Sequence, residues 1–202
     1  MKVSEPAEQE RLVILEAFIA VVAERGYEDT ELRAVFARAG VDEVAFLRHF
    51  PDKEECFLAA WDFLTDCFMP KVLAAFESKE TWREQIRGVG LALAEYLTEH
   101  PDHARILCLE GRVPGPRAWA LLDRNVEVFA ELIDLGRQEM ADPDSLTRAT
   151  AEGLAGAIHE QLILYVSRGD GDQLSQLMGP MMYMVMRPYL GDEVALEELR
   201  RT

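Results

Sequence analysis

The chain has 202 residues, of which 49% are hydrophobic and 29% charged, and its formal net charge is −16. This length and apolar content suffice for one small and one medium domain that share a core, which excludes disorder on a large scale. The negative charge excludes a surface that is basic everywhere, so any nucleic-acid site must be local.

The start of the chain and its cysteines indicate the compartment. Residues 1–10, MKVSEPAEQE, are polar and acidic, unlike a secretory signal. The longest apolar stretch, residues 12–23, contains Glu16 and is too short to span a bilayer. Three cysteines at positions 56, 67 and 108 form neither an even set nor a metal-ligand cluster, as in a reducing compartment. We therefore expect a cytoplasmic protein.

The hydrophobic periodicity is helical almost throughout, and no segment alternates as a strand does, so we predict an all-α protein. The first helix is predicted from about Ala7 to Arg25, where Gly26 ends it, and its predicted inward stripe is Leu15, Phe18, Ile19 and Val22. A second helix is predicted to begin at Thr30 as N-cap and end near Gly40. A third is predicted to begin at Asp42 as N-cap and end near Phe50.

Two capping boxes mark the next helices. Asp52 with Glu55 predicts a long helix to about Lys79, kinked at Pro70. Thr81 with Glu84 predicts a helix that ends near His100. The remaining predicted helices are Asp102 to about Glu110, Arg117 to Met140, Asp144 to Arg168 and Asp172 to Leu190 with a kink at Gly179-Pro180, followed by a short helix after Gly191.

Residues 11–61 resemble, without gaps, the DNA-binding domain of the TetR/AcrR family of transcriptional regulators. The segments that carry the resemblance are Ala23-Glu24-Arg25-Gly26-Tyr27, Thr30 and Arg33, Ala37-Arg38-Ala39-Gly40-Val41 and Arg48-His49-Phe50-Pro51 with Lys53-Glu54. The rest of the chain is similar to the family more loosely, through His100-Pro101 and Pro188-Tyr189-Leu190-Gly191.

The resemblance implies an N-terminal three-helix helix-turn-helix domain at residues 1–52 and a C-terminal helical ligand-binding and dimerisation domain at residues 53–202. It implies a homodimer whose two recognition helices enter successive major grooves of operator DNA. The function implied is that of a ligand-responsive repressor whose effector is a small apolar or amphipathic molecule. No membrane partner is implied.

The residues that we expect to contact DNA come from the two helices of the motif and their flanks: Thr30, Arg33, Glu43, Ala45, Leu47, Arg48, His49 and Lys53. Leu47 stands where the family usually has a tyrosine that donates to a phosphate. Residues 1–29 carry three basic and seven acidic side chains, and residues 30–53 carry four of each. The alternative is therefore a TetR-like dimer that has lost specific DNA binding and acts through a protein partner or as a ligand-binding protein.

The second domain is expected to hold an apolar ligand cavity among the helices between Asp52 and Leu135, where Gly88, Gly90 and Gly111 suggest room. The expected lining residues are Trp61, Phe68, Leu93, Tyr96, Leu107, Cys108, Phe129 and His159. The last long helix carries five methionines in nine positions and is apolar on every face, which favours a four-helix dimer interface. Its expected apolar centre is Leu154, Ile158, Leu162, Leu177, Met181 and Met184.

Enzymatic activity is not expected. The chain has no glycine-rich phosphate loop and no nucleophile elbow. His100 and His103 have a ligand-like spacing, but Pro101 interrupts it and no third ligand is near in sequence. We expect no cofactor, no metal and no catalytic residue.

Overall fold

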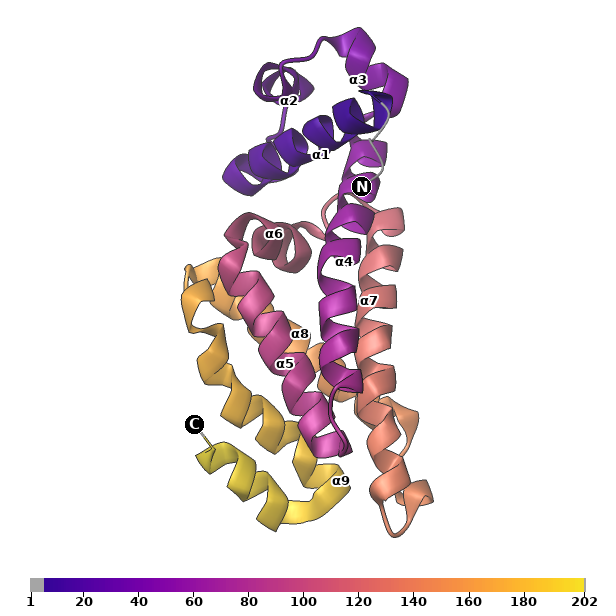
Figure 1. The fold of residues 1–202 in the computed structure, drawn as a ribbon, viewed down its shortest axis with the longest axis vertical. Coiled ribbons are helices and arrows are strands. Elements are labelled where there is room, and N and C mark those ends of the chain that lie inside the picture. The colour runs from indigo at the N-terminus through magenta and orange to yellow at the C-terminus, as the bar shows by residue number, and fades with distance from the viewer. Residues whose placement is uncertain (1–5, 202) are drawn as a thin grey trace. The chain divides into compact units, whose positions relative to one another are not determined.

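The computed structural model describes residues 6–201. Within this range all regular secondary structure is helical, which confirms the predicted all-α class (Figure 1). The chain divides into two compact units: unit 1 comprises the residues up to Asp66 together with Asp102–Leu121, and unit 2 comprises Cys67–Pro101 and the residues from Leu122 onward. The predicted functional boundary after residue 52 stays a prediction. By packing, unit 1 also includes the first half of α4 and the segment 102–121.

Among the described residues, unit 1 contains three N-terminal helices and all or part of four further elements that pack with them. These elements are α1 (Pro6–Arg25), α2 (Leu32–Ala39), α3 (Glu43–His49), the first half of α4 (Lys53–Glu77), α6 (Pro101–Arg105), the π-helix η1 (Ile106–Glu110) and the start of α7 (Pro116–Asp134). The inward stripe predicted for α1 is buried: Leu15, Phe18, Ile19 and Val22. The ring of Phe57 lies 6.5 Å from that of Phe18 and 5.2 Å from that of Tyr27, so α4 joins the same core.

The helix caps of unit 1 follow two predictions and correct a third. Asp52 caps α4 as predicted, because its Oδ1 accepts from the Glu55 backbone N–H at 2.8 Å. Asp42 caps α3, because its Oδ1 accepts from the Ala45 backbone N–H at 2.8 Å. Thr30 does not cap α2: the N-cap is Glu31, which makes no side-chain hydrogen bond to the helix. The Thr30 hydroxyl instead donates to the Gly26 carbonyl at 2.7 Å, where the chain turns with a φ of 84° at Gly26.

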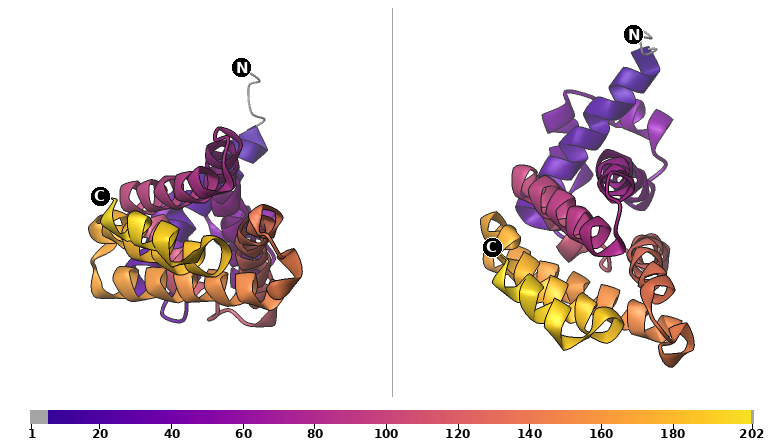
Figure 2. Two further views of the ribbon diagram at one scale, coloured as in Figure 1. Left: turned by 90° about the horizontal axis from the view of Figure 1, so that it is seen from below. Right: turned by 60° about the horizontal axis from the view of Figure 1, so that its bottom comes forward.

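Unit 2 contains the second half of α4 and the remaining helices. These elements are α5 (Trp82–Glu99), the rest of α7, the short 3₁₀-helices η2 (Leu135–Glu139), η3 (Pro143–Ser145) and η4 (Gly171–Leu177), α8 (Arg148–Arg168) and α9 (Met178–Arg200). Thr81 caps α5 as predicted. Trp82 is central to the core, because its ring lies 5.0 Å from that of Tyr189 and its Nε1 donates to the Leu132 carbonyl. Helices α8 and α9 lie against each other (Figure 2).

Several boundaries in unit 2 differ from the predictions. Helix α8 begins at Arg148 rather than Asp144, and residues 171–177 form a 3₁₀ segment, so α9 begins only at Met178. Gly179-Pro180 therefore lies in the first turn of α9, where proline is tolerated, and produces no kink. The bend occurs at Gly191, whose φ is 84° and ψ is 176°.

The part of α9 after Gly191 folds back along the part before it, as the yellow end of the ribbon in Figure 1 shows. A Cβ built at Gly179 would lie 3.3 Å from the Leu199 carbonyl oxygen, so the two backbones are in close contact. The expectation that Gly88 and Gly90 mark open space is wrong. A Cβ at Gly88 would lie 3.1 Å from the Ala75 carbonyl oxygen, and one at Gly90 2.6 Å from a methionine methyl group. These glycines permit close packing within unit 2.

No helix among residues 6–201 has the length and apolarity that a membrane crossing requires.

Candidate nucleic-acid interface

Helix α3 is a short helix fixed from one side. Phe46 is fully buried, and its ring lies 5.2 Å from that of Phe36 in α2 and 5.6 Å from that of Phe50. Ala45 is only 6% exposed and lies on the same inner side. The geometry therefore does not favour the DNA contact predicted for Ala45, because the side chain has almost no surface to offer. Its burial could not be read from the sequence of so short a helix.

The outer side of α3 consists of four exposed residues, Glu43, Val44, Leu47 and Arg48. Three of them were predicted to contact DNA, and Val44 was missed. Val44 is 70% exposed and Leu47 49% exposed. The spacing of Val44 and Leu47, three residues apart, was the signal that could have identified Val44.

Each arginine of α2 and α3 is paired with a carboxylate of unit 1. Arg33 pairs with Glu31, Arg38 donates to Glu24 at 2.5 Å, and Arg48 lies 3.3 Å from Glu10 of α1. All three arginine side chains remain substantially exposed. Exposed ion pairs of this kind contribute about 0 to 1 kcal/mol, so a phosphate could replace the carboxylate at little cost.

His49 differs from these arginines because its side chain is mostly buried. Its Nε2 lies 2.8 Å from Oε1 of Glu10, which also faces Arg48. Glu10 thus ties the C-terminal end of α3 to α1. This contact makes His49 a positioning residue for α3 in this conformation, and its predicted DNA contact remains a prediction.

Lys53 holds the turn between α1 and α2. Its Nζ lies within hydrogen-bond distance of three carbonyl oxygens, those of Tyr27 (2.7 Å), Thr30 (3.0 Å) and Glu28 (3.3 Å). It also lies 4.4 Å from the centre of the Tyr27 ring. These carbonyls match the three donors of an ammonium group, and burial lowers the pKa of Lys53. The predicted phosphate contact is less favoured by this geometry than a structural role.

The same turn is held from a second side by Glu110, a residue that sequence reasoning missed. Glu110 is buried at the end of η1, and its Oε2 accepts from the Tyr27 backbone N–H at 3.0 Å. Oε1 lies 3.5 Å from the position of a Cβ built on Gly26. Because 83 residues separate the two partners, no local pattern could have identified the contact.

The residues predicted to line a ligand cavity fall into both units. Trp61, Leu107 and Cys108 are buried in unit 1, where burial raises the pKa of the Cys108 thiol to about 12. Trp61 Nε1 is buried and has no hydrogen-bond partner among the described residues. In unit 2 the rings of Phe68 and Tyr96 lie 5.8 Å apart. Leu93, Phe129 and His159 are half-buried in unit 2. The convergence of the whole set on one cavity stays a prediction.

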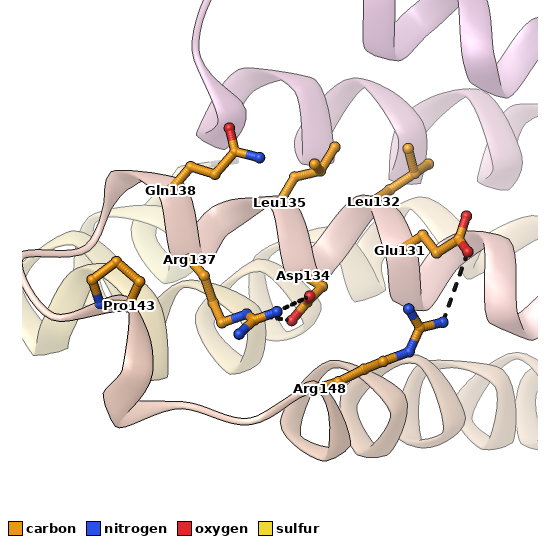
Figure 3. Close-up of a pocket in the computed structure, with 8 residues that line it drawn as sticks. All are labelled: Glu131, Leu132, Asp134, Leu135, Arg137, Gln138, Pro143 and Arg148. Atoms are coloured by element: carbon orange, nitrogen blue, oxygen red, sulfur yellow. Dashed lines mark hydrogen bonds and ion pairs between the residues drawn. The ribbon is translucent and has the colours of Figure 1, made fainter.

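A pocket of about 600 Å³ lies elsewhere in unit 2 (Figure 3). It is lined by Glu131, Leu132, Asp134, Leu135, Arg137, Gln138, Pro143 and Arg148, none of which was predicted to bind a ligand. Its charged groups face one another: Arg137 Nε donates to Asp134 at 2.8 Å, and Arg148 lies 3.7 Å from Glu131. Residues 6–201 contain no group of three or more His, Cys, Asp or Glu side chains placed to hold a metal ion.

The predicted dimer residues divide into two groups. Leu162 and Leu177 are buried within the chain itself. The other four, Leu154, Ile158, Met181 and Met184, are half-buried. Three further methionines, Met178, Met182 and Met186, belong to the core of unit 2. The methionine run is therefore explained in part by packing within one chain.

Comparisons with known proteins agree with the helix-turn-helix. Residues 14–60 match the family model described as "Bacterial regulatory proteins, tetR family". The uncharacterized HTH-type transcriptional regulator YuxN of Bacillus subtilis (strain 168) is 26% identical over 107 residues, which cover 53% of this chain and 36% of YuxN. The matched part thus spans about a third of that relative.

Two solved structures are similar over most of the fold. The fatty acid degradation regulator FadR of Bacillus halodurans has a TM-score of 0.78 at 18% identity, covering 91% of this chain and 96% of its own. The transcriptional regulator FadR of Bacillus subtilis, solved in complex with stearoyl-CoA, has a TM-score of 0.75 at 17% identity, covering 89% and 98%. At these identities the likeness concerns the fold.

Proposed function

Because residues 14–60 match the TetR family model, we propose that this chain is a TetR-type, ligand-responsive transcriptional repressor that binds operator DNA as a homodimer. It acts by binding rather than by catalysis, in the cytoplasm where operator DNA is accessible. The observation that carries the proposal is the geometry of α3. Its inner side is fixed by Phe46 and its N-terminus by Asp42, while its outer side is free. A seven-residue helix held in this way is what a recognition helix requires.

A salt-titrated binding assay on genomic fragments tests the DNA part of the proposal. The full-length protein should retain specific fragments, with an affinity that falls only gradually as salt rises, because residues 30–53 carry only four basic side chains that could neutralise phosphates. Arg48→Ala should weaken binding to every fragment. Arg187→Ala is the matched control, since Arg187 is an exposed arginine of unit 2 that donates to its own carboxylate, Asp192, at 2.7 Å. Absence of any specific fragment at all salt concentrations would contradict the proposal.

We propose an acyl-CoA thioester as the effector class, since it combines an apolar chain with a charged head, as expected for an amphipathic ligand. The proposal is supported by the stearoyl-CoA complex of the B. subtilis regulator, whose fold this chain shares. A thermal-shift assay with stearoyl-CoA, with coenzyme A alone as control, should raise Tm only for the thioester. The same compound should release the retained DNA fragment. If Tm stays unchanged with acyl-CoA thioesters of every chain length tested, acyl-CoA thioesters are excluded as effectors.

The buried contact between Glu110 and Tyr27 offers a route by which a ligand could act on the DNA-binding helices. Glu110 belongs to η1, which also carries the predicted lining residues Leu107 and Cys108. A displacement of η1 would withdraw the acceptor from the Tyr27 N–H and loosen the turn that precedes α2. The response to ligand should therefore depend on Glu110.

Dimerisation through α8 and α9 remains the proposed assembly. The surface that supports it includes Leu164, which is 40% exposed on α8, and the half-buried Met181 and Met184 on α9. Leu164→Glu should yield a monomer in sedimentation experiments at micromolar concentration. Leu91→Glu, at a leucine of α5 with similar exposure, should leave the dimer intact.

The second candidate function is that of a TetR-like dimer without specific DNA binding. It is favoured by the pairing of every arginine of α2 and α3 with a carboxylate and by the engagement of Lys53 with carbonyl oxygens. The salt-titrated assay separates the two candidates, because this one requires that no fragment is preferred.

A further inference from the structure

The outer side of α3 has an apolar centre and charged edges. At about 100° per residue, Glu43 and Arg48 lie about 140° apart around the helix axis. Val44 and Leu47 lie between them on this arc. Both aliphatic side chains are largely exposed, at 70% and 49%, whereas the residues on the opposite side of the helix are buried. The helix therefore presents two neighbouring aliphatic side chains at the middle of its free surface.

The environment of this pair agrees with a polyanion as occupant. Arg48 borders the pair on α3, and Arg33 is largely exposed on α2, the preceding helix of the motif. Both arginines can exchange an exposed carboxylate partner for a phosphate. A helix of seven residues is about 10 Å long, and the major groove of B-DNA, about 12 Å wide, admits it.

Base pairs differ in what they present to an apolar side chain in that groove. The C5-methyl group of thymine is the one methyl group among the four patterns, and where it stands cytosine has only a hydrogen atom. An aliphatic side chain against a G·C edge would cover donors and acceptors without replacing their water, which costs free energy. The same side chain against a thymine methyl buries apolar surface on both partners, which is favourable.

We propose that Val44 and Leu47 read thymine methyl groups, so that each operator half-site contains T·A pairs at the two positions under the centre of α3. This inference rests on the proposed function and specifies its substrate. Val44 and Leu47 are then specificity-determining residues, whereas Arg33 and Arg48 contribute affinity without sequence preference.

The test begins with selection of bound duplexes from a random pool by the full-length protein, which should enrich half-sites with thymine at fixed central positions. Each of these thymines is then replaced by deoxyuridine, which removes only the methyl group. Affinity of the wild-type protein should fall about fourfold for each central thymine. Replacement of thymines outside the enriched positions should have no effect. Because this measurement uses unaltered protein, it does not depend on the folding of a variant.

Alanine variants assign each methyl group to a side chain. Val44→Ala should remove the sensitivity to deoxyuridine at one central position, and Leu47→Ala at the other. Leu91→Ala, at an exposed leucine of α5, is the matched control and should behave as wild type. Enriched sites without central thymines, or equal affinity for thymine and deoxyuridine sites, would overturn this inference while leaving the proposed function in place. A failure to enrich any sequence at any salt concentration would overturn both.

Discussion

The helix-turn-helix of unit 1 and the end of α9 in unit 2 contain ion pairs of the same kind that differ in burial. In unit 1, Arg38 donates to Glu24 at 2.5 Å, and both side chains are about half exposed. In unit 2, Glu198 near the end of α9 has a side chain that is 0% exposed and accepts from Arg87 at 2.7 Å and from Arg83 at 2.5 Å. Burial, and not the number of ion pairs, therefore determines whether an arginine is committed to the fold or available to a ligand.

In unit 2, these and further bonds fix the segment after Gly191 to α5. Arg87 also donates to the Arg201 carbonyl at 3.0 Å, and Arg201 donates to Glu84 at 2.6 Å. Both partners in the first turns of α5 thus hold the segment that follows the bend at Gly191. The pairs of Arg38 with Glu24 and of Arg48 with Glu10 also join helices of unit 1, but both arginines stay exposed, which suits a surface that must exchange carboxylates for phosphates.

The largest effect is expected from Glu198→Gln. The substitution removes the charge that compensates the nearly buried Arg87, and loss of one partner of a buried pair costs about 3 to 5 kcal/mol. Urea denaturation followed by tryptophan fluorescence measures the free energy of unfolding. Glu24→Gln is the control for an exposed pair and should have little effect. Equal losses of stability from the two substitutions would show that burial does not determine how much these ion pairs contribute.

A smaller effect is expected from Glu110→Ala in unit 1. The change leaves the part-buried Tyr27 N–H without its acceptor, which costs about 1 to 2 kcal/mol. The variant should also bind effector without releasing DNA. Glu127→Ala, at an exposed glutamate that accepts from Arg148, is the control. Normal release of DNA by the Glu110 variant would exclude the proposed route of coupling.

For the N-caps of α2 and α3, the expected change in the free energy of unfolding is about 1 kcal/mol. Asp42→Ala should lower the free energy of unfolding by about this amount, because Oδ1 of Asp42 satisfies the Ala45 N–H. Glu31→Ala is the matched substitution, since Glu31 occupies the N-cap of α2 without a side-chain hydrogen bond. A loss of stability as large for Glu31→Ala would show that charge, and not capping, is responsible.

The smallest effect is expected from neutralising the partner of an exposed arginine. Glu24→Gln frees Arg38 and should strengthen DNA binding by at most about fivefold at low salt, because the lost pair is worth no more than about 1 kcal/mol. Asp192→Asn, which frees Arg187 in unit 2, should leave DNA affinity unchanged. A gain of equal size from both substitutions would mean that net charge alone controls affinity.

The sequence also predicted which side of each helix faces inward more reliably in long helices than in short ones. Helix α1 has twenty residues, and its predicted stripe is buried. Helix α3 has seven, so two turns do not establish a periodicity, and the buried Ala45 was predicted to contact DNA while the exposed Val44 was missed. In unit 2, the short 3₁₀ segments have no pattern of their own, which displaced the predicted starts of α8 and α9.

The all-α class, the helices of the helix-turn-helix and the caps at Asp42 and Thr81 could be predicted from the sequence, because they depend on residues within a few positions of one another. The roles of Lys53, Glu110 and Glu198 follow only from the packing of distant segments. Their partners lie 23 to 26, 83, and 111 to 115 residues away. A charged side chain has the same character in the sequence whether it will meet water, a carbonyl oxygen or a buried arginine. Only folding sets the burial that separates an exchangeable pair from a permanent one.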